Sequence, residues 1–544
     1  MQVSYTNILI TLLSIAVILC IKFCISTTYG VFVYPLYRSP LRHLPGPKNG
    51  FFWGQTLNFL RAKSANELPI KFMKENPKTP LIYYRHITNS EWLLVNSVRA
   101  CRELLQTKCY EFEKPGYFRR VIGEIAGKGL VNEEGNKHKS ERKVLNEQPG
   151  GLPSIANVRR IVPVFNEKAQ ELTSRINVHN EETSEASING KYISCSIEMH
   201  SLISFLVSEI FSKTTLDIIG RASLGVELNS ISVEGSTFSQ LYHRIFNQPP
   251  AGQIISLINM FIPVRWLPVQ ANLAFVNANR ETRRLIREII RERKREIFRN
   301  RVESNDIREE FTRTGSKDFL TYMLYEKGQG ANGWSEDDIL GHLRAEIREK
   351  IPSDESPTYT NLESLDYMSL FLKEVVRCFS PSVMITRKPS HDHVTLCNIP
   401  IPKSTTILLN PQSLQFNPAI WGPDAEIFDP YRHADNDPRA KQYPDSKDPY
   451  AIATFSNGPR ICIGKHFASL EMRSLLVEIL RNFELVRGWD DRGQKLRDGV
   501  GYEGGNNIGS DIFAGVKVRN SITLKPENGV WVRFKHLESD NNTF

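Results

Sequence analysis

The chain has 544 residues, of which 40% are hydrophobic, and its 69 lysines and arginines exceed its 60 aspartates and glutamates, for a formal net charge of +9. This composition excludes a disordered, collagenous or low-complexity protein. The small excess of positive charge is spread along the chain, so no polybasic nucleic-acid tail stands out. The eight cysteines contain no Cys-x-x-Cys pair, which argues against a disulfide framework or a paired-cysteine zinc site.

Residues 8–25 form an apolar run that contains only Thr11, Ser14 and Lys22 as polar residues. As a helix this run is about 27 Å long, which is enough to cross a bilayer. We favour an uncleaved membrane anchor over residues 1–28 instead of a signal peptide, because no basic segment precedes the run and no small-x-small cleavage pattern follows it. Three basic residues follow the run before residue 50 and none precedes it, so the positive-inside rule places the rest of the chain in the cytoplasm.

Four prolines lie between residues 29 and 49. Because proline fixes φ and lacks an N–H donor, we expect a stiff, extended linker there. Residues 50–544 contain no second linker of this kind and no internal repeat, which predicts one domain that is mainly α with small β-sheets (α+β). Strands are expected at Leu81–Arg85, Trp92–Asn96 and Val530–Phe534.

The most informative segment reads Phe-Ser-Asn-Gly-Pro-Arg-Ile-Cys-Ile-Gly over residues 455–464, directly before a long helical pattern. We expect Gly458 and Gly464 to let the backbone turn tightly around the sulfur of Cys462, and backbone N–H groups and the helix N-terminus to stabilise a thiolate there. Arg460 can neutralise an acidic group of a ligand bound at that sulfur. A thiolate that ligates iron needs this environment.

The pattern Phe455-x-x-Gly458-x-Arg460-x-Cys462-x-Gly464 resembles the haem-binding loop of the cytochrome P-450 superfamily. The resemblance extends over nearly the whole chain and implies a cytochrome P-450 fold with an N-terminal transmembrane helix. It also implies haem b as the cofactor, Cys462 as the axial ligand of the iron and Arg460 as the partner of a haem propionate.

Two further segments support this resemblance. Glu374 and Arg377 lie one turn apart in a helical pattern, which alone would indicate a surface ion pair worth at most about 1 kcal/mol. Together with Arg432 they resemble the family's buried Glu–Arg–Arg triad. The resemblance implies that these three residues hold the thiolate loop in place and act in folding and not in chemistry.

Three more residues are candidates for binding the haem propionates. His138 and Arg142 resemble the family's aromatic-x-x-x-Arg helix, although histidine replaces the usual tryptophan. Arg387 is similar to an arginine that also reaches a propionate in family members. For each of the three, an ordinary surface charge is the alternative.

The resemblance implies a monooxygenase that inserts one oxygen atom into a C–H bond or a double bond of a hydrophobic small molecule. Electrons would come from NADPH through a reductase, at the endoplasmic reticulum membrane, with the catalytic domain in the cytoplasm. Several segments look like fungal microsomal members of secondary metabolism, so a terpenoid or a polyketide is the first guess for the substrate. No nucleic-acid partner is expected.

Two sets of residues are candidates for contacts with these partners. A basic face would complement the acidic docking face of a reductase. Its residues are Lys137, Lys139, Arg142, Lys143, Lys465 and Arg473. Ordinary solvated surface charges are an equally simple explanation of these residues. The apolar candidates for substrate contact are Tyr117, Phe118, Ile122, Ile125, Phe246–Ile262 and Val383–Ile385.

The pattern breaks in the middle of the chain. Family members carry a long helix on the distal haem face with an Ala/Gly-Gly-x-Asp/Glu-Thr-Thr motif that delivers protons, and this sequence contains no equivalent. Leu343 runs directly into residues 344–350, which resemble the segment after that helix. We therefore expect the central distal helix to be truncated by about 30 residues, or some 45 Å of helix.

An incorrectly spliced gene model would explain this loss together with unusual stretches at residues 148–153 and 201–210. The 544-residue chain is then expected to bind haem poorly and not to hydroxylate. Two alternatives to a monooxygenase stay open. One is a haem-thiolate isomerase or dehydratase that needs no external electrons, and the other is a membrane-tethered pseudoenzyme.

Overall fold

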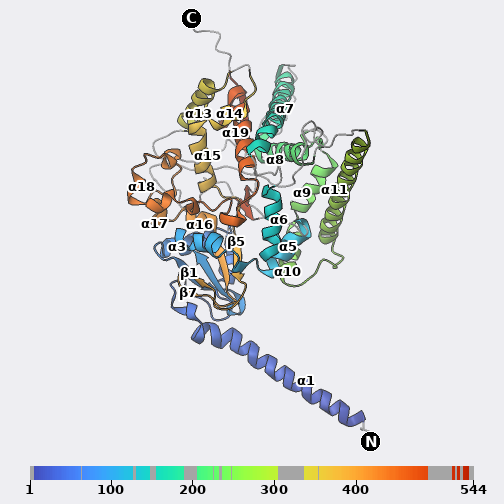
Figure 1. Cartoon of the computed structure of the whole chain (residues 1–544), viewed down its shortest axis with the longest axis vertical. Coiled ribbons are helices and arrows are strands. Elements are labelled where there is room, and N and C mark those ends of the chain that lie inside the picture. The colour runs from blue at the N-terminus through green and yellow to red at the C-terminus, as the bar shows by residue number, and fades with distance from the viewer. Residues whose placement is uncertain are drawn as a thin grey trace.

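The molecule has a mainly helical body from which one long N-terminal helix projects (Figure 1). The computed structural model describes residues 5–62, 64–126, 130–147, 155–188, 205–224, 226–231, 236–246, 248–303, 336–352, 355–487, 518–520, 524–526 and 531–537.

The projecting helix α1, Tyr5–Thr28, continues without a break into the π-helical turns of η1, Tyr29–Arg38, and a 3-10 helix, η2, Pro40–His43, follows after the extended residue Ser39. The stretch Thr11–His43 is long and apolar enough to cross a membrane. The prediction of an extended linker is therefore wrong for residues 29–38. Pro35, the single proline inside η1, does not break the helix, and an extended chain begins only after η2.

The helix η1 is attached to the body by specific contacts. Its Phe32 ring stacks on the ring of Phe51 with 5.3 Å between centroids. The side-chain amide of Asn89 donates a hydrogen bond to the carbonyl oxygen of Val31 at 3.0 Å. These contacts hold the end of the projecting helix against the first sheet.

That sheet has five strands in the order β1-β2-β8-β5-β3. The strands are β1 Leu81–Arg85, β2 Glu91–Val95, β3 Phe112–Glu113, β5 Ile385–Pro389 and β8 Thr406–Leu409. All neighbours are antiparallel except β2 and β8, which are parallel. The two early strands expected from the sequence are present, the second displaced by one residue.

Helices form the rest of the body. Near the sheet they are α2 Thr56–Arg61, α3 Glu67–Glu75, η3 Ile87–Asn89, α4 Val98–Arg102 and η4 Glu103–Thr107. The next group is α5 Gly116–Ala126, α6 Gly135–Glu147, α7 Ile155–Ile188, α8 Val207–Ile219, η5 Gly220–Leu224, α9 Thr237–Phe246, α10 Pro250–Phe261 and α11 Gln270–Glu303. Figure 1 shows α11 along the edge of the body opposite α13.

The later helices are α13 Glu336–Lys350, α14 Tyr359–Glu363, α15 Asp366–Cys378, α16 Pro411–Gln415, α17 Pro418–Trp421, η6 Pro430–His433, α18 Arg439–Gln442, η7 Pro444–Lys447, η8 Pro449–Ala451, η9 Gly458–Arg460 and α19 Lys465–Asn482. Small sheets pair β6 Thr395–Leu396 with β7 Ile399–Pro400, β10 Val518–Asn520 with β11 Leu524–Pro526, and β12 Trp531–His536 with β4 Phe205–Leu206 and β9 Phe483–Arg487. The strand expected near the C-terminus is thus confirmed.

The largest apolar core lies where α19 packs on α7, with α13 and α15 beside them. Phe165 of α7 meets Phe467 of α19 edge to face, with 4.9 Å between ring centroids. Because α19 begins three residues after Cys462, this core fixes the helix that follows the thiolate loop. The mainly α architecture with small sheets agrees with the predicted fold class.

Helix α13 carries the residues on either side of the expected truncation. Leu343 and Ile347 are buried in the core with α15 and α19, and the Glu346 carboxylate accepts hydrogen bonds from the backbone N–H groups of Tyr367 and Met368, at 2.8 and 2.9 Å. These contacts place α13 at the start of α15. Residues 304–335, which precede this helix, lie outside the described residues, as do the unusual residues 148–153.

Candidate active site

The thiolate loop closes on itself by a backbone hydrogen bond. Cys462 N–H donates to the Phe455 carbonyl oxygen at 2.8 Å. Between them Gly458 has φ +65°, and a Cβ built on it would lie 2.2 Å from the carbonyl oxygen of Leu105 in η4. A side chain at this position would therefore meet both an unfavourable backbone conformation and a steric clash, as the sequence led us to expect of this glycine.

Gly464 has a backbone conformation that does not require a glycine. Its φ of −88° and ψ of 12° are accessible to any residue, and it serves as the N-cap of α19. Burial raises the pKa of the Cys462 thiol, while a hydrogen bond from the Gly464 backbone N–H and the charges of Arg142 and Lys465 act in the opposite direction. The expected backbone N–H is therefore present, although burial has the larger effect on the pKa of the thiol.

Glu374, Arg377 and Arg432 meet behind this loop, and all three are buried. Arg377 binds the Glu374 carboxylate with two hydrogen bonds of 2.7 Å, from Nε and Nη2. Arg432 Nε lies 3.6 Å from Glu374 Oε1, and His433 Nε2 lies 2.8 Å from Oε2. Burial opposes ionisation of Glu374, but Arg377 and then His433 hold its pKa well below its usual range. The sequence did not single out His433.

Gln415 connects this cluster to the thiolate loop, and sequence reasoning missed it. Its side-chain oxygen accepts hydrogen bonds from the backbone N–H of Ala453 at 2.9 Å and from the Thr454 hydroxyl at 3.1 Å. Its backbone carbonyl accepts a hydrogen bond from Arg377 Nη1 at 2.7 Å. Two hydrogen bonds, one from Arg377 to Gln415 and one from Ala453 to Gln415, thus link the Glu374–Arg377 pair to the segment just before Phe455.

On another side of the loop, basic side chains gather. Arg387 of β5 and His138 of α6 are buried, and Arg460 is nearly so. Within the described residues the guanidinium of Arg387 makes one hydrogen bond, to the carbonyl oxygen of its neighbour Thr386 at 2.8 Å. Arg142 is half-buried, and burial lowers its pKa. The structure therefore brings together the four residues predicted to face the haem propionates.

Lys114 and Glu134 complete this group, and the sequence had not marked either of them. Lys114 Nζ lies 3.0 Å from Glu134 Oε1, and Arg460 forms an ion pair with the other oxygen, Oε2. Burial, followed by repulsion from Arg460 and Arg387, lowers the pKa of Lys114 to about 8. We call Lys114, Arg142, Arg387 and Arg460, with His138 and Glu134, the cationic cluster.

The cationic cluster suits the carboxylates of a haem. It holds four basic side chains of lysine or arginine and one carboxylate, and Arg460 Nε is buried without a hydrogen-bond partner among the described residues. Burying such an excess of positive charge is costly unless an anion compensates it. The residues present thus fit an anionic ligand beside Cys462.

The predicted basic face is only partly exposed. Lys137 and Lys465 are exposed, and the Lys139 ammonium lies 4.2 Å from the centre of the Tyr110 ring. Arg473 does not belong to this face, because it is buried on α19 with an ion pair to Glu363 and a hydrogen bond to Ser369.

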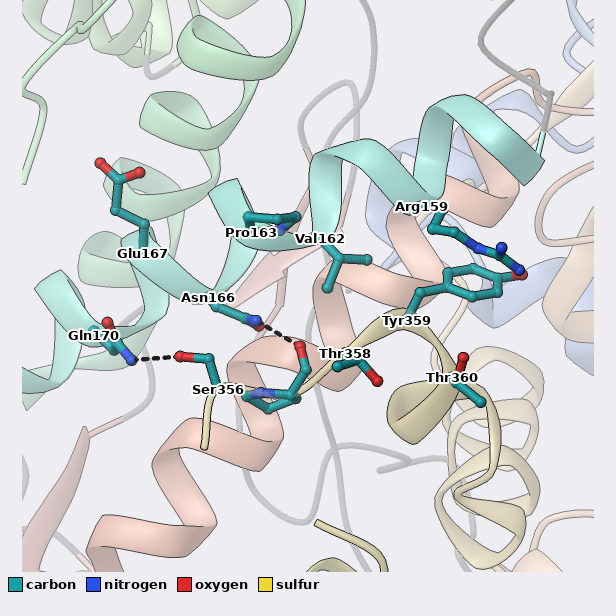
Figure 2. A pocket seen from close by; sticks show the side chains of 11 residues that line it. Arg159, Val162, Pro163, Asn166, Glu167, Gln170, Ser356, Thr358, Tyr359 and Thr360 are labelled. Atoms are coloured by element: carbon teal, nitrogen blue, oxygen red, sulfur yellow. Dashed lines mark hydrogen bonds between the residues drawn. The ribbon is translucent and has the colours of Figure 1, made fainter. Parts of the chain in front are cut away.

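The apolar segments predicted to contact substrate lie on α5, on α9 and α10, and before β5. Ile125 and Phe246 pack against a small core that α9 and α11 share. A separate crevice of about 470 Å³ lies between α7 and the segment 356–360 (Figure 2). There Asn166 donates a hydrogen bond to the carbonyl of Pro357, and Arg159 lies over the ring of Tyr359. None of the predicted site residues lines this crevice.

Comparison with known proteins agrees with these features. The family model of cytochrome P450 matches residues 44–342 and 335–491. The chain is 28% identical to the cytochrome P450 monooxygenase sphH of Aspergillus fumigatus, over 94% of this chain and 91% of that one. It is also 28% identical to the cytochrome P450 monooxygenase FUM15 of Gibberella moniliformis, over 90% of each chain. The chain therefore belongs to the cytochrome P450 family.

Proposed function

We propose that this chain is a haem-thiolate monooxygenase in which Cys462 is the axial ligand of the iron. The haem, when bound, supplies the activation of dioxygen and the transfer of one oxygen atom to substrate. The observation that carries the proposal is the position of Cys462 between the hydrogen-bonded thiolate loop and the N-terminus of α19, next to the cationic cluster.

The residues around the sulfur have distinct roles in this proposal. Phe455 and Gly458 shape the loop, and the Gly464 N–H donates to the sulfur. Arg387, Arg460, His138 and Arg142 bind the haem propionates. Glu374, Arg377 and Arg432 hold the loop from behind, so they act in folding and not in chemistry.

The experiment is the absorption spectrum of the ferrous carbon monoxide complex. The wild type should show the long-wavelength Soret band of thiolate ligation, and Cys462→Ser should lose it. Cys397→Ser is the control, because that free, half-buried thiol lies between β6 and β7. Retention of the long-wavelength band in Cys462→Ser would show that another residue ligates the iron.

The substrate and partners follow from the same proposal. The apolar residues of α5 and α10 favour a hydrophobic small molecule from fungal secondary metabolism, with a terpenoid or a polyketide as the first candidate. The helix α1 would hold the protein in the endoplasmic reticulum membrane with its catalytic domain in the cytoplasm, where a reductase delivers electrons from NADPH. Consumption of NADPH coupled to an oxygenated product distinguishes this activity from that of an isomerase or a dehydratase.

A specific observation favours a second candidate, an inactive form of the same enzyme. The family model matches in two parts that overlap at residues 335–342, next to the position where about 30 residues of the distal helix are expected to be missing. The acid and alcohol that deliver protons to dioxygen would be lost with that helix. In this second candidate, the 544-residue chain binds haem weakly and does not hydroxylate.

The test compares the 544-residue chain with a form that carries the distal helix of a relative between Leu343 and Arg344. Both are expressed with a reductase and NADPH, and haem per protein and oxygenated product are measured. We expect product only from the lengthened form. Equal product from both forms would contradict the proposed truncation, and a sequenced transcript that joins the two codons would refute the splicing explanation.

A further inference from the structure

Two cysteines of α1 lie one helical turn apart on an uncovered face. Cys20 and Cys24 are four residues apart, so their side chains project from the same side of the helix, about 6 Å apart along its axis. Both are exposed free thiols, and the stretch that is apolar enough to cross a membrane is not buried against the body. The described cysteines of the body are all buried or half-buried, so this pair is distinct from them.

Lys22 indicates how deep the pair lies in a bilayer. It is the single charged residue of the apolar run 8–25. A charged side chain is costly at the centre of a bilayer, so the long stem of a lysine carries its ammonium to the headgroups. Cys20 and Cys24 each lie two residues, or about 3 Å, from Lys22 along the helix axis. The two thiols are therefore near the headgroups as well.

The contacts of η1 with the body show which boundary this is. The Val31 carbonyl accepts a hydrogen bond from Asn89, and Phe32 stacks on Phe51, so the helix has reached the body by residue 31. Cys24 lies seven residues, or about 10 Å, before that point. The basic residues that follow before residue 50 place this end of the helix on the cytoplasmic side.

A thiol at the cytoplasmic boundary of a membrane can react with a long-chain acyl-coenzyme A. The cytoplasm keeps thiols reduced, and the acyl tail inserts among the lipids and brings the thioester to the same depth as the thiol. Attack of the cysteine sulfur on the thioester carbonyl forms a new carbon–sulfur bond and breaks the one to coenzyme A. The thiol proton goes to the released coenzyme A, so the exchange needs no oxidant or reductant.

We infer that Cys20 and Cys24 are sites of reversible S-acylation by long-chain fatty acids. The inference rests on the membrane placement of α1 in the proposed function, and it does not depend on haem. The attached chains would lie beside α1 and add apolar contact with lipid at the end of the helix where Lys22 leaves the bilayer. They would thereby fix the depth of α1 and of the body that η1 holds.

The test counts thioesters on the full chain in the microsomal membranes of a yeast that produces it. Free thiols are blocked with N-ethylmaleimide, thioesters are cleaved with neutral hydroxylamine, and each thiol so released is labelled with a maleimide polyethylene glycol that shifts the band on a gel. The wild type should show a double shift that depends on hydroxylamine. Cys20→Ala and Cys24→Ala should each show a single shift, and the double variant none. An alkyne analogue of palmitate fed to the cells should label the same bands.

Leu13 and Val17 provide a matched control for depth. They lie on the same face of α1 as the two cysteines, seven residues earlier and so about 10 Å deeper in the proposed orientation, and both are exposed. In a chain that carries Cys20→Ala and Cys24→Ala, adding Leu13→Cys and Val17→Cys should give no shift that depends on hydroxylamine. Cys397→Ala, at a half-buried position in the body, should keep both shifts.

The outcomes separate this inference from the proposed anchor. If sodium carbonate releases the wild type from the membranes, the proposed anchor is wrong and the inference fails with it. If the wild type stays in the membranes and shows no shift, the inference fails while the anchor stands. A thiol released by dithiothreitol but not by hydroxylamine would show a disulfide in place of a thioester. Equal shifts from the deeper pair of cysteines would contradict the argument from depth.

Discussion

Gln415 and Arg377 bind each other through two reciprocal hydrogen bonds. Arg377 Nη1 donates to the backbone carbonyl of Gln415 at 2.7 Å, and Gln415 Nε2 donates to the backbone carbonyl of Arg377 at 2.6 Å. The remaining acceptor of the Gln415 side chain binds Ala453 and Thr454, just before the thiolate loop. Through these hydrogen bonds Gln415 links α15 to the segment that carries Cys462.

Replacing Gln415 with leucine should therefore disturb the thiolate loop specifically. The substitution leaves the buried backbone N–H of Ala453 without its acceptor and the backbone carbonyl of Arg377 without the amide donor. These losses cost roughly 2–3 kcal/mol in the free energy of unfolding, whereas the Thr454 hydroxyl keeps the Val376 carbonyl oxygen as an acceptor at 2.8 Å. We also expect part of the bound haem to lose thiolate ligation, measured as a larger share of the short-wavelength Soret band in the ferrous carbon monoxide spectrum.

Gln412 supplies the control for this prediction. It is an equally buried glutamine on the same helix, α16, but it bonds Asn66 and the carbonyl of Cys378 instead of the thiolate loop. Gln412→Leu should lower stability by a similar amount and leave the Soret position of the remaining holoprotein unchanged. Identical spectra for the two variants would argue against the connection through Gln415.

Gly458→Ala should be among the least tolerated small substitutions in the loop. The φ of +65° costs an alanine about 1–2 kcal/mol, and the added Cβ would also lie 2.2 Å from the Leu105 carbonyl oxygen. We expect a lower melting temperature and lower haem content per purified protein.

Gly135→Ala separates the two causes of this loss. Gly135 has φ +56°, but a Cβ there would meet nothing within 4 Å. Its variant should therefore show only the conformational cost. Equal losses of melting temperature in both variants would mean that the backbone moves away from Leu105 without cost.

The residues that the sequence predicted are those whose spacing repeats a known pattern. Cys462 and its loop, and the pair Glu374 and Arg377, lie in short contiguous segments, so their placement could be anticipated. Gln415 and Glu134 could not, because their partners are 38 and 326 residues away and no local pattern marks them.

Two predictions failed because they depended on tertiary contacts that the local sequence does not reveal. Arg473 was taken for a surface charge, but the α19 helix turns it toward Glu363 and Ser369. The proline-rich linker was expected to be extended, but the apolar residues of η1 continue the helix as far as Arg38 and pack on the body. In both cases tertiary contacts decided what composition alone could not.

His138 should make the apoprotein sensitive to mild acid. Burial, followed by the charges of Arg460, Lys114 and Arg142, lowers its pKa to about 4, while Glu134 acts in the opposite direction. The unfolded chain, with a histidine pKa near 6.5, therefore binds a proton that the folded protein does not. The free energy of unfolding should fall as the pH falls from about 6.5 to 4, by about 3 kcal/mol.

His138→Phe should remove this part of the pH dependence. Tyr110, whose hydroxyl lies 3.3 Å from His138 Nδ1, has a raised pKa and does not titrate in this range. The measurement is urea unfolding of the apoprotein at several pH values, with His43→Phe, at an exposed position, as the control. Parallel curves for wild type and His138→Phe would contradict a buried, neutral histidine.

Glu346 should be essential for the start of α15. No side chain caps this helix at Leu365, and the Glu346 carboxylate from α13 instead accepts the N–H groups of Tyr367 and Met368. Because α15 carries Glu374 and Arg377, an unravelled first turn would loosen the support of the thiolate loop. Glu346→Ala leaves two N–H groups without an acceptor and should cost roughly 2–4 kcal/mol in the free energy of unfolding.

Glu346→Gln keeps one acceptor oxygen and should lose about half of that amount. Glu349→Ala, at an exposed position on the same helix, should change stability by less than about 0.5 kcal/mol. Chemical denaturation of the three variants gives these differences. Since Glu346 lies only three residues after the Leu343–Arg344 junction, the same series in the lengthened form tests whether α13 keeps its position when the distal helix is restored. A smaller effect of Glu346→Ala in that form would show that α13 caps α15 only in the shortened chain.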